Sequence, residues 1–429
     1  IWESIQQVLD QKFKKTGVEN AYFPLLIPES YLKREADHVE GFAPELAVVT
    51  HAGGEKLAEP LVIRPTSETI IYEMFSKWIS SYRDLPVVIN QWANVVRWEK
   101  RTRLFLRTTE FLWQEGHTAH ATSEDAYKRA EQMHEVYRSF AEDYLAMPVI
   151  MGKKTESEKF AGAETTYTIE AMMQDGKALQ AGTSHVLAEH FTKAFNVKFL
   201  DADGREKYVR STSWGASTRL IGSLIMAHSD DSGLVLPPMI APIQVVIVPV
   251  WSNEEEKEKI LAKSSEIEKR LNDNNVKVKI DDREMRPGPR FFEWEKKGVP
   301  LRLEIGPRDL ERGEIILVRR DTGEKGSVGD DSVSEIKDLL ITIQNDLFEK
   351  AKEFREDHTK SVSTFNDLQA QIEDGFALAG WCGSTECEEK IKSVKGTIRC
   401  IPLESSNTAE KCSICGKKSK YDVVVAKAY

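Results

Sequence analysis

One stretch of the chain decides the fold: it reads Arg97-Trp-Glu-Lys-Arg-Thr-Arg-Leu-Phe-Leu-Arg107-Thr-Thr-Glu-Phe111 and continues, after one leucine, with Trp113-Gln-Glu-Gly-His117. Arginine presents a planar fork of donors that matches the oxygens of phosphates and carboxylates. The stretch contains no glycine-rich phosphate loop, and no GxGxxG pattern opens a helix near it. It therefore predicts that arginine side chains bind a phosphate ligand here.

Three further segments carry related residue types: Arg64-Pro-Thr-Ser-Glu68, Gln180-Ala-Gly-Thr-Ser-His185 and Ser213-Trp-Gly-Ala-Ser-Thr-Arg219. Each one alone has an ordinary structural explanation. An Arg-x-Glu pattern is most often a surface ion pair, a tryptophan in an apolar run is most often a core residue, and a glycine before Thr-Ser most often marks a turn. Their joint occurrence favours one composite binding site.

Length and composition bound the class of protein. The 429 residues, 41% of them hydrophobic, suffice for two or three domains. A net charge of −10 means that any contact with RNA must use local basic patches. No apolar run approaches the roughly 20 residues that span a bilayer, and the acidic, amphipathic start at residues 1–10 is not a signal peptide. Because the chain does not start with Met, we expect Ile1 to lie inside a longer protein or to follow a removed segment.

Changes of pattern along the chain predict three domains. Proline breaks at 237–238 and 242 close a first domain, 1–240, which we interpret as α+β with a mostly antiparallel sheet. Alternating strand and helix patterns then predict an α/β domain over 241–335. A small domain, 336–429, begins with most of a charged helix and ends with the cysteine segment. The clearest expected helices are 124–144, 254–275 and 333–358, and the clearest expected strands are 85–90, 244–250, 276–280, 301–305 and 314–318.

All five cysteines lie between residues 382 and 415. An odd number in one short segment argues against a disulfide framework and indicates a reducing compartment, so we expect a cytoplasmic protein. Two close pairs, Cys382-x₄-Cys387 and Cys412-x₂-Cys415, predict a tetrahedral structural Zn²⁺ site. Cys400 is left over, and we interpret it as a packed thiol.

The motifs together resemble a known class of enzyme. Arg97-x-Glu99 with Arg107-x-x-x-Phe111 resembles the second signature motif of class II aminoacyl-tRNA synthetases, and Gly215 to Arg219 resembles the third. The stretch 21–28 resembles the end of the first motif, which forms the dimer interface in that class. Four short segments are similar to those of prolyl-tRNA synthetases of archaea and of the eukaryotic cytosol: residues 64–68, 90–92, 111–117 and 182–185.

The resemblance implies a fold class and an activity. It implies an α+β catalytic domain on an antiparallel sheet, an α/β anticodon-binding domain and a small α+β zinc-binding C-terminal domain. The activity would be activation of L-proline with ATP and Mg²⁺, followed by transfer to tRNA(Pro), in a homodimer with no membrane segment.

The resemblance also implies residue roles. Arg97 is the expected catalytic residue, because it would bridge the proline carboxylate and the α-phosphate. Expected ATP-binding residues are Arg97, Glu99, Arg107, Phe111, Gln180, Thr183 and Arg219. Expected proline-binding residues are Phe42, Thr66, Glu68, Arg97, Trp113, Glu115 and His185. Glu295, Arg302 and Arg308 would contact the anticodon, and the C-terminal carboxylate of Tyr429 would fold back toward the active site.

Two other functions compete with this prediction. A non-catalytic, synthetase-like RNA-binding protein would be expected to have lost the phosphate arginines, yet Arg97, Arg107 and Arg219 are present. The second competing function is a synthetase for a different amino acid, such as threonine or serine. A threonyl enzyme would be expected to carry a zinc site in its catalytic domain, but no cysteine precedes Cys382. Proline offers no polar side-chain group by which the enzyme could select it. We therefore also expect activation of cysteine, which is close to proline in volume. About 100 residues between the second and third motifs leave no room for an editing insertion.

Overall fold

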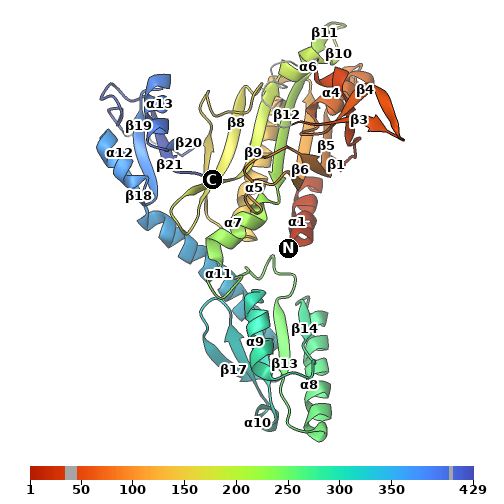
Figure 1. The fold of residues 1–429 in the computed structure, drawn as a ribbon, viewed down its shortest axis with the longest axis vertical. Coiled ribbons are helices and arrows are strands. Elements are labelled where there is room, and N and C mark those ends of the chain that lie inside the picture. The colour runs from red at the N-terminus through yellow and green to blue at the C-terminus, as the bar shows by residue number, and fades with distance from the viewer. Residues whose placement is uncertain (34–45, 405–408) are drawn as a thin grey trace. The chain divides into compact units, whose positions relative to one another are not determined.

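A computed structural model describes residues 1–33, 46–404 and 409–429 of the chain. It divides into two compact units, each described by itself (Figure 1). The larger unit comprises residues 9–139, 149–223 and 357–429, and the smaller one 1–8, 140–148 and 224–356. Among the helices in the described ranges, none is long and apolar enough to cross a membrane.

An 11-stranded sheet is the frame of the larger unit. Its neighbouring strands pair antiparallel, except for β1 with β5 and β18 with β19, which pair parallel. The predicted, mostly antiparallel sheet is therefore confirmed. In spatial order the strands are β1 (Glu19–Asn20), β5 (Val87–Val96), β6 (Glu110–His120), β12 (Arg210–Ser217), β9 (Ala178–Ala188), β8 (Thr165–Met172), β7 (Val149–Lys153), β20 (Thr397–Pro402), β21 (Tyr421–Ala426), β19 (Phe376–Trp381) and β18 (Thr359–Val362).

Helices cover this sheet because their apolar faces need a partner. In α4 (Glu68–Trp78), Tyr72 stacks on Phe191 of α6 (His190–Ala194) with ring centroids 5.4 Å apart. Both side chains belong to one buried cluster with Phe75 and Phe199. The larger unit also contains α2 (Glu29–Leu32), η2 (Tyr82–Asp84), α12 (Phe365–Gln371), α13 (Thr385–Ser393), the sheet of β2 (Leu26–Pro28), β4 (Glu55–Ile63) and β3 (Ala47–Ala52), and the pair β10 (Lys198–Leu200) and β11 (Glu206–Tyr208). The helices α1 (Trp2–Lys14), α5 (Ser123–Asp143) and α7 (Arg219–His228) have residues in both units.

The C-terminal strands continue the same sheet. Strand β20 pairs with β7, so that Ile401 lies opposite Lys153 and Pro402 opposite Gly152. The contact is close: a Cβ on Gly152 would lie 2.5 Å from the Cβ of Cys400. Cys400 is fully buried there, which agrees with the expected packed thiol, and burial raises its pKa to about 12.

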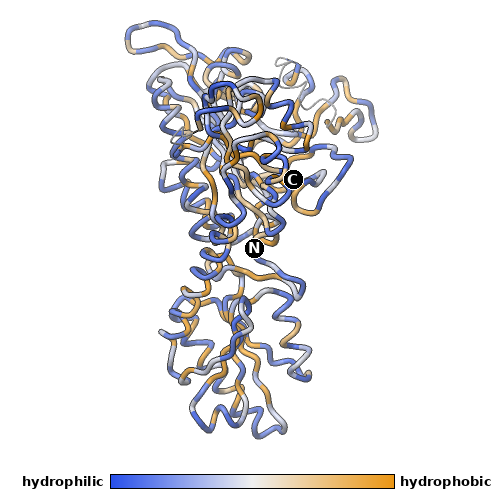
Figure 2. The backbone as a smooth tube through the Cα atoms, turned by 90° about the vertical axis from the view of Figure 1, so that its left-hand side faces the viewer, coloured by the Kyte–Doolittle hydropathy of each residue, from blue (hydrophilic) through white to orange (hydrophobic). Residues whose placement is uncertain are grey.

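The smaller unit contains the predicted α/β sheet. Its five strands lie in the order β14 (Val278–Ile280), β13 (Val245–Pro249), β15 (Leu301–Ile305), β16 (Glu314–Arg319) and β17 (Lys325–Gly329). The helices are α8 (Glu254–Asp273), α9 (Pro287–Lys296), α10 (Pro307–Arg312) and α11 (Val333–Asp357). Hydrophobic residues are concentrated along the central strands of this unit (Figure 2), and β13 is buried along its whole length. The predicted helices and strands of 244–358 are present, whereas α9, α10 and β17 had not been placed from sequence.

Candidate functional site

The strand register of the large sheet brings the sequence motifs together. On β6 and β12, Glu115 lies opposite Gly215, and His117 lies opposite Ser213. Ser213 also lies opposite His185 of β9. Because alternate residues of a strand share one face, these side chains line one cavity of about 320 Å³. Its lining residues are Thr66, Glu68, Arg97, Phe111, Trp113, Glu115, His117, Glu158, Phe160, Thr166, Gln180, Thr183, His185, Ser213, Trp214, Gly215, Ala216, Ser217 and Arg219.

Arg97 lies where this cavity meets a second one. Its Nε donates to the carbonyl of Pro65 at 3.0 Å. Its guanidinium carbon lies 5.4 Å from the ring centroid of Phe111 and 5.6 Å from that of Trp113. These contacts orient the guanidinium, and the second cavity, of about 240 Å³, also contains Arg97 in its wall.

The second cavity is rich in positive charge. Arg107 lies 3.8 Å from the Glu99 carboxylate, and the Nε and Nη2 of Arg219 donate to the carbonyl of Leu106 at 3.3 and 3.2 Å. Desolvation, together with the charges of Arg107 and Arg97, lowers the pKa of Arg219. Three cations that repel one another across a cavity favour a polyanionic ligand. The lining residues are Arg97, Glu99, Phe105, Leu106, Arg107, Thr108, Phe111, Ser217 and Arg219.

A buried acidic cluster contributes to the wall of the first cavity. Glu115 accepts hydrogen bonds from Ser67, from Gln91 at 2.9 Å and from His117 at 3.0 Å. Glu68 accepts from the hydroxyl of its neighbour Thr66. All these groups are buried. The cluster brings two carboxylates, Glu68 and Glu115, beside a single histidine, and this surplus of acidic groups favours a ligand with an ammonium group.

The pKa values of two histidines of this cavity are shifted in opposite directions. Burial by itself would lower the pKa of His117, but its hydrogen bond to Glu115 and the charges of Glu68 and Glu115 outweigh burial and raise it. For His185, burial lowers the pKa to about 4, so its ring is neutral at pH 7. Thr166 Oγ1 lies 2.9 Å from His185 Nδ1, and the ring of Phe160 lies 4.7 Å from the His185 ring.

Most predicted substrate residues meet in these two cavities. The exception is Phe42, which lies outside the described residues. Sequence reasoning missed Ser67, Gln91, His117, Glu158 and Phe160 as members of the site or its support. His117 had a direct signal, because it follows Glu115 by two residues in a strand and therefore shares its face.

The chain end lies beside the motif residues. The backbone N–H of Tyr429 donates to the carbonyl of Ala178 at 3.3 Å, two residues before Gln180. Its hydroxyl donates to Asp175, and the Arg103 guanidinium lies 5.9 Å from its ring centroid. Arg103 belongs to the loop between Glu99 and Arg107. The C-terminal residue is thus held against two segments of the site.

In the smaller unit, Glu295 and Arg302 line one cavity of about 210 Å³, together with Val246, Trp294, Val299, Val318, Arg319, Arg320, Gly323 and Lys325. Arg302 contacts Glu304 at 2.9 Å, and its guanidinium lies 4.3 Å from the ring centroid of Phe291. Arg308, on α10, is exposed and does not line this cavity. The structure therefore brings two of the three predicted anticodon residues together.

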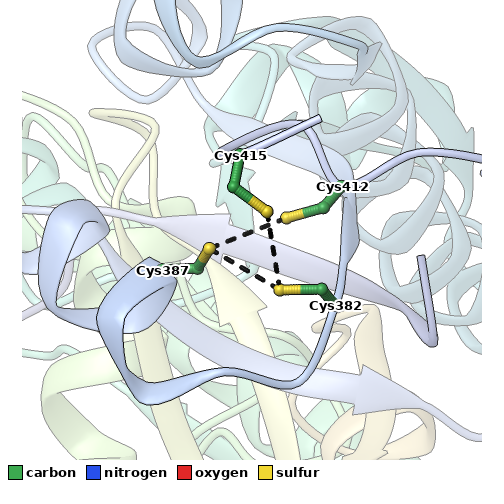
Figure 3. A group of neighbouring side chains, drawn as sticks. All are labelled: Cys382, Cys387, Cys412 and Cys415. Atoms are coloured by element: carbon green, nitrogen blue, oxygen red, sulfur yellow. Dashed lines mark hydrogen bonds between the residues drawn. The ribbon is translucent and has the colours of Figure 1, made fainter. Parts of the chain in front are cut away.

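The four paired cysteines converge as predicted (Figure 3). The Sγ atoms of Cys382 and Cys387 are 3.6 Å apart, those of Cys387 and Cys412 3.9 Å, and those of Cys382 and Cys415 3.7 Å. A tetrahedron of thiolates about 2.3 Å from Zn²⁺ has edges of about 3.8 Å. The donor set and its spacing fit a zinc ion.

The antiparallel sheet and its arginine-lined cavities define a class II aminoacyl-tRNA synthetase. The family model "tRNA synthetase class II core domain (G, H, P, S and T)" matches residues 52–228. "Anticodon binding domain" matches 244–339, and "Prolyl-tRNA synthetase, C-terminal" matches 365–429.

Full-length relatives narrow the class. "Proline--tRNA ligase" of Chloroherpeton thalassium is 59% identical over 100% of this chain and 91% of its own. That of Alkaliphilus oremlandii is 57% identical over 100% of this chain and 90% of its own. "Proline--tRNA ligase 2" of Clostridioides difficile is 55% identical with the same coverage. The chain belongs to the proline–tRNA ligase family. The predicted family and fold class are confirmed, and the threonyl and seryl alternatives are set aside.

Proposed function

We propose that this protein activates L-proline with ATP and transfers it to tRNA(Pro). The observation that carries the proposal is a pair of cavities that share Arg97 in their walls: a buried acidic cluster lines one of them, and three arginines line the other. An amino acid fits the first cavity with its ammonium at the acids, and ATP fits the second. Family membership supports the same assignment.

Activation needs little acid–base chemistry. The proline carboxylate is already ionised at pH 7 and attacks the α-phosphorus of ATP, so the barrier is mainly the repulsion of anions and the cost of alignment. Arg97 would contact both the carboxylate and the α-phosphate. Arg107 and Arg219 would hold the outer phosphates, with Mg²⁺ entering as the counterion of ATP. Phe111 would stack on the adenine, and Glu99, Gln180 and Thr183 would bind the rest of the nucleotide.

The first cavity suits a secondary ammonium and a small apolar ring. Glu68 and Thr66 would bind the ammonium, and Trp113, Glu115 and His185 would surround the ring. No polar group distinguishes the proline ring, so discrimination against smaller amino acids depends on lost contacts worth about 1–3 kcal/mol. We therefore expect activation of cysteine, which is close in volume to proline.

Internal editing is not expected. The residues between Phe111 and Ser213 are all described, and they form β6, α5, β7, β8, β9, α6, β10, β11 and the start of β12. Most of these elements build the catalytic sheet and its cover. This distribution supports an enzyme that does not hydrolyse alanyl-tRNA; rapid hydrolysis by the purified protein would refute this expectation.

The remaining roles follow from the other sites. Glu295 and Arg302, and by resemblance Arg308, would read the guanines of the anticodon, because arginine matches guanine O6 and N7. Zn²⁺ held by Cys382, Cys387, Cys412 and Cys415 would supply a structural cross-link. The carboxylate of Tyr429 would help to order the active site.

We also propose the three domains 1–240, 241–335 and 336–429, and a cytoplasmic location, which the free cysteines support.

A homodimer is part of the proposal. Tyr22 and Leu26, in the stretch that resembles the first class motif, are 73% and 41% exposed. Large apolar side chains exposed on one segment are typical of an interface. Sedimentation should therefore show a dimer, and a monomer at micromolar concentration would count against this part.

ATP–pyrophosphate exchange tests the main proposal, because it detects the adenylate-forming step without tRNA. Exchange that depends most strongly on proline is expected.

A further inference from the structure

The segment between β7 and β8 forms one wall of the cavity that we assign to proline. Glu158 and Phe160 of this segment line the cavity. The backbone N–H of Phe160 donates to Thr166 Oγ1 at 3.0 Å, and the same oxygen lies 2.9 Å from His185 Nδ1. The Thr166 hydroxyl therefore links the backbone of this segment to the ring of His185. The position of this segment therefore sets both a wall of the cavity and a contact that orients the ring of His185.

The segment is held from outside the catalytic motifs. Glu388, on α13, accepts hydrogen bonds from Thr155 Oγ1 at 2.8 Å and from Ser157 Oγ at 2.6 Å. One turn further along the same helix, Lys392 forms an ion pair with Glu158 at 3.0 Å. Residues four apart share one helix face, so this face of α13 contacts the segment at three points.

The contact at Glu388 is the strongest of these. Glu388 is only 3% exposed, and a buried carboxylate forms hydrogen bonds that are stronger than those of neutral groups. It also follows Cys387, whose backbone N–H is capped by Ser384 at 3.3 Å. Two consecutive residues of α13 thus have different partners: Cys387 belongs to the predicted zinc site, and Glu388 contacts the segment between β7 and β8.

We infer that Glu388 is a positioning residue for the proline cavity: it fixes residues 155–160 and, through Phe160 and Thr166, the ring of His185. The inference rests on the proposed function. It gives the C-terminal part of the chain a role in amino-acid binding, because a carboxylate on its zinc-proximal helix holds a wall of the cavity. Glu388 itself does not line the cavity, so it acts only through the segment.

The experiment compares KM values for proline and for ATP in pyrophosphate exchange, with the zinc content of each protein measured in parallel. Glu388→Ala should raise the KM for proline about tenfold and leave the KM for ATP within about twofold. Glu388→Gln keeps an oxygen that accepts from Thr155 and Ser157, so it should restore most of the affinity. Glu389→Ala is the matched control, because Glu389 is exposed on the same helix and lies 3.9 Å from Lys392.

A second variant covers the case in which Glu388→Ala misfolds or loses zinc. Ser157→Ala removes one donor from an exposed position and should raise the KM for proline severalfold. The inference is wrong if the folded Glu388→Ala protein matches Glu389→Ala, or if the proline and ATP values rise equally. A Ser157→Ala protein with unaltered KM would also overturn it where Glu388→Ala does not fold. Absence of proline-dependent exchange in the unaltered protein would instead refute the proposed function, and this inference with it.

Discussion

Gly116 of β6 lies directly against the indole of Trp214 on β12: a Cβ at Gly116 would come within 1.9 Å of the Trp214 ring. The two residues are register partners, and Trp214 is 1% exposed. On the core side, the centroid of the indole lies 6.1 Å from that of the Phe13 ring. The glycine between Glu115 and His117 is therefore required by packing behind the site.

Gly116→Ala should destabilise the protein by roughly 1–3 kcal/mol or more, because overpacking a close-packed core forces strain. Thermal unfolding checks this, with Gly326→Ala as control. A Cβ at Gly326 meets no atom within 4 Å. Equal melting temperatures of the two variants would contradict the packing argument.

Acid should destabilise the smaller unit through His228. Burial lowers the pKa of His228 to about 4, even though its ring nitrogen lies 2.8 Å from the carbonyl of Leu145. The folded pKa is below the unfolded value near 6.5, so this stabilisation is present above pH 6.5 and is lost as the pH falls toward 4. At pH 5.5 the loss is about 1.4 kcal/mol.

Urea unfolding at pH 7.5 and 5.5 measures this effect. The His228→Gln protein, whose amide can still donate to Leu145, should lose about 1.4 kcal/mol less between the two values. An identical pH dependence in both proteins would rule out titration of His228 as a cause.

The cysteine cluster predicts about one zinc ion per chain. Cys412→Ser should abolish zinc binding and lower the melting temperature, because the folded C-terminal part loses its cross-link. Cys400→Ser is the matched control, since Cys400 packs against Gly152, away from the four converging thiols. Elemental analysis that finds no zinc in the unaltered protein, or equal zinc in both variants, would contradict the assignment.

Arg302→Ala should impair the charging of tRNA but not the formation of the adenylate. The loss of an arginine–guanine contact should cost about 1–3 kcal/mol in tRNA charging and leave proline-dependent pyrophosphate exchange unchanged. Lys269→Ala provides the control, because Lys269 is exposed on α8 of the same unit and does not line the cavity. An equal loss of charging and exchange on changing Arg302 would show that the residue acts on folding rather than on the anticodon.

Local patterns predicted much of this fold. The strand at 244–250 and the helix at 254–275 appear as β13 and α8, because a buried run and an amphipathic stripe are signals contained in a few neighbouring residues. Spacing also predicted the cysteine cluster. The catalytic sheet was expected to be mostly antiparallel, but its strands β6, β12 and β9 were not placed from sequence, since β12 pairs with β6, which lies far from it along the chain.

What the sequence could not provide was contact between distant segments. Glu388 bonds to Ser157 across 231 positions, and nothing near either residue indicates that contact. Gln91 was missed as a partner of Glu115 for the same reason, because it depends on the pairing of β5 with β6. His117 could have been found, since the two-residue period of a strand places it on the face of Glu115.

Arg97 lines both the cavity proposed for the amino acid and the cavity proposed for the nucleotide. Its role is tested by ATP–pyrophosphate exchange with each of the twenty amino acids, on the unaltered protein and on Arg97→Ala. Exchange should be strongest with proline, weaker with cysteine, and reduced about 100-fold or more in Arg97→Ala, because the variant lacks the cation at the reacting centre. Exchange with no amino acid from a folded, zinc-loaded dimer would contradict the account and favour a non-catalytic RNA-binding protein.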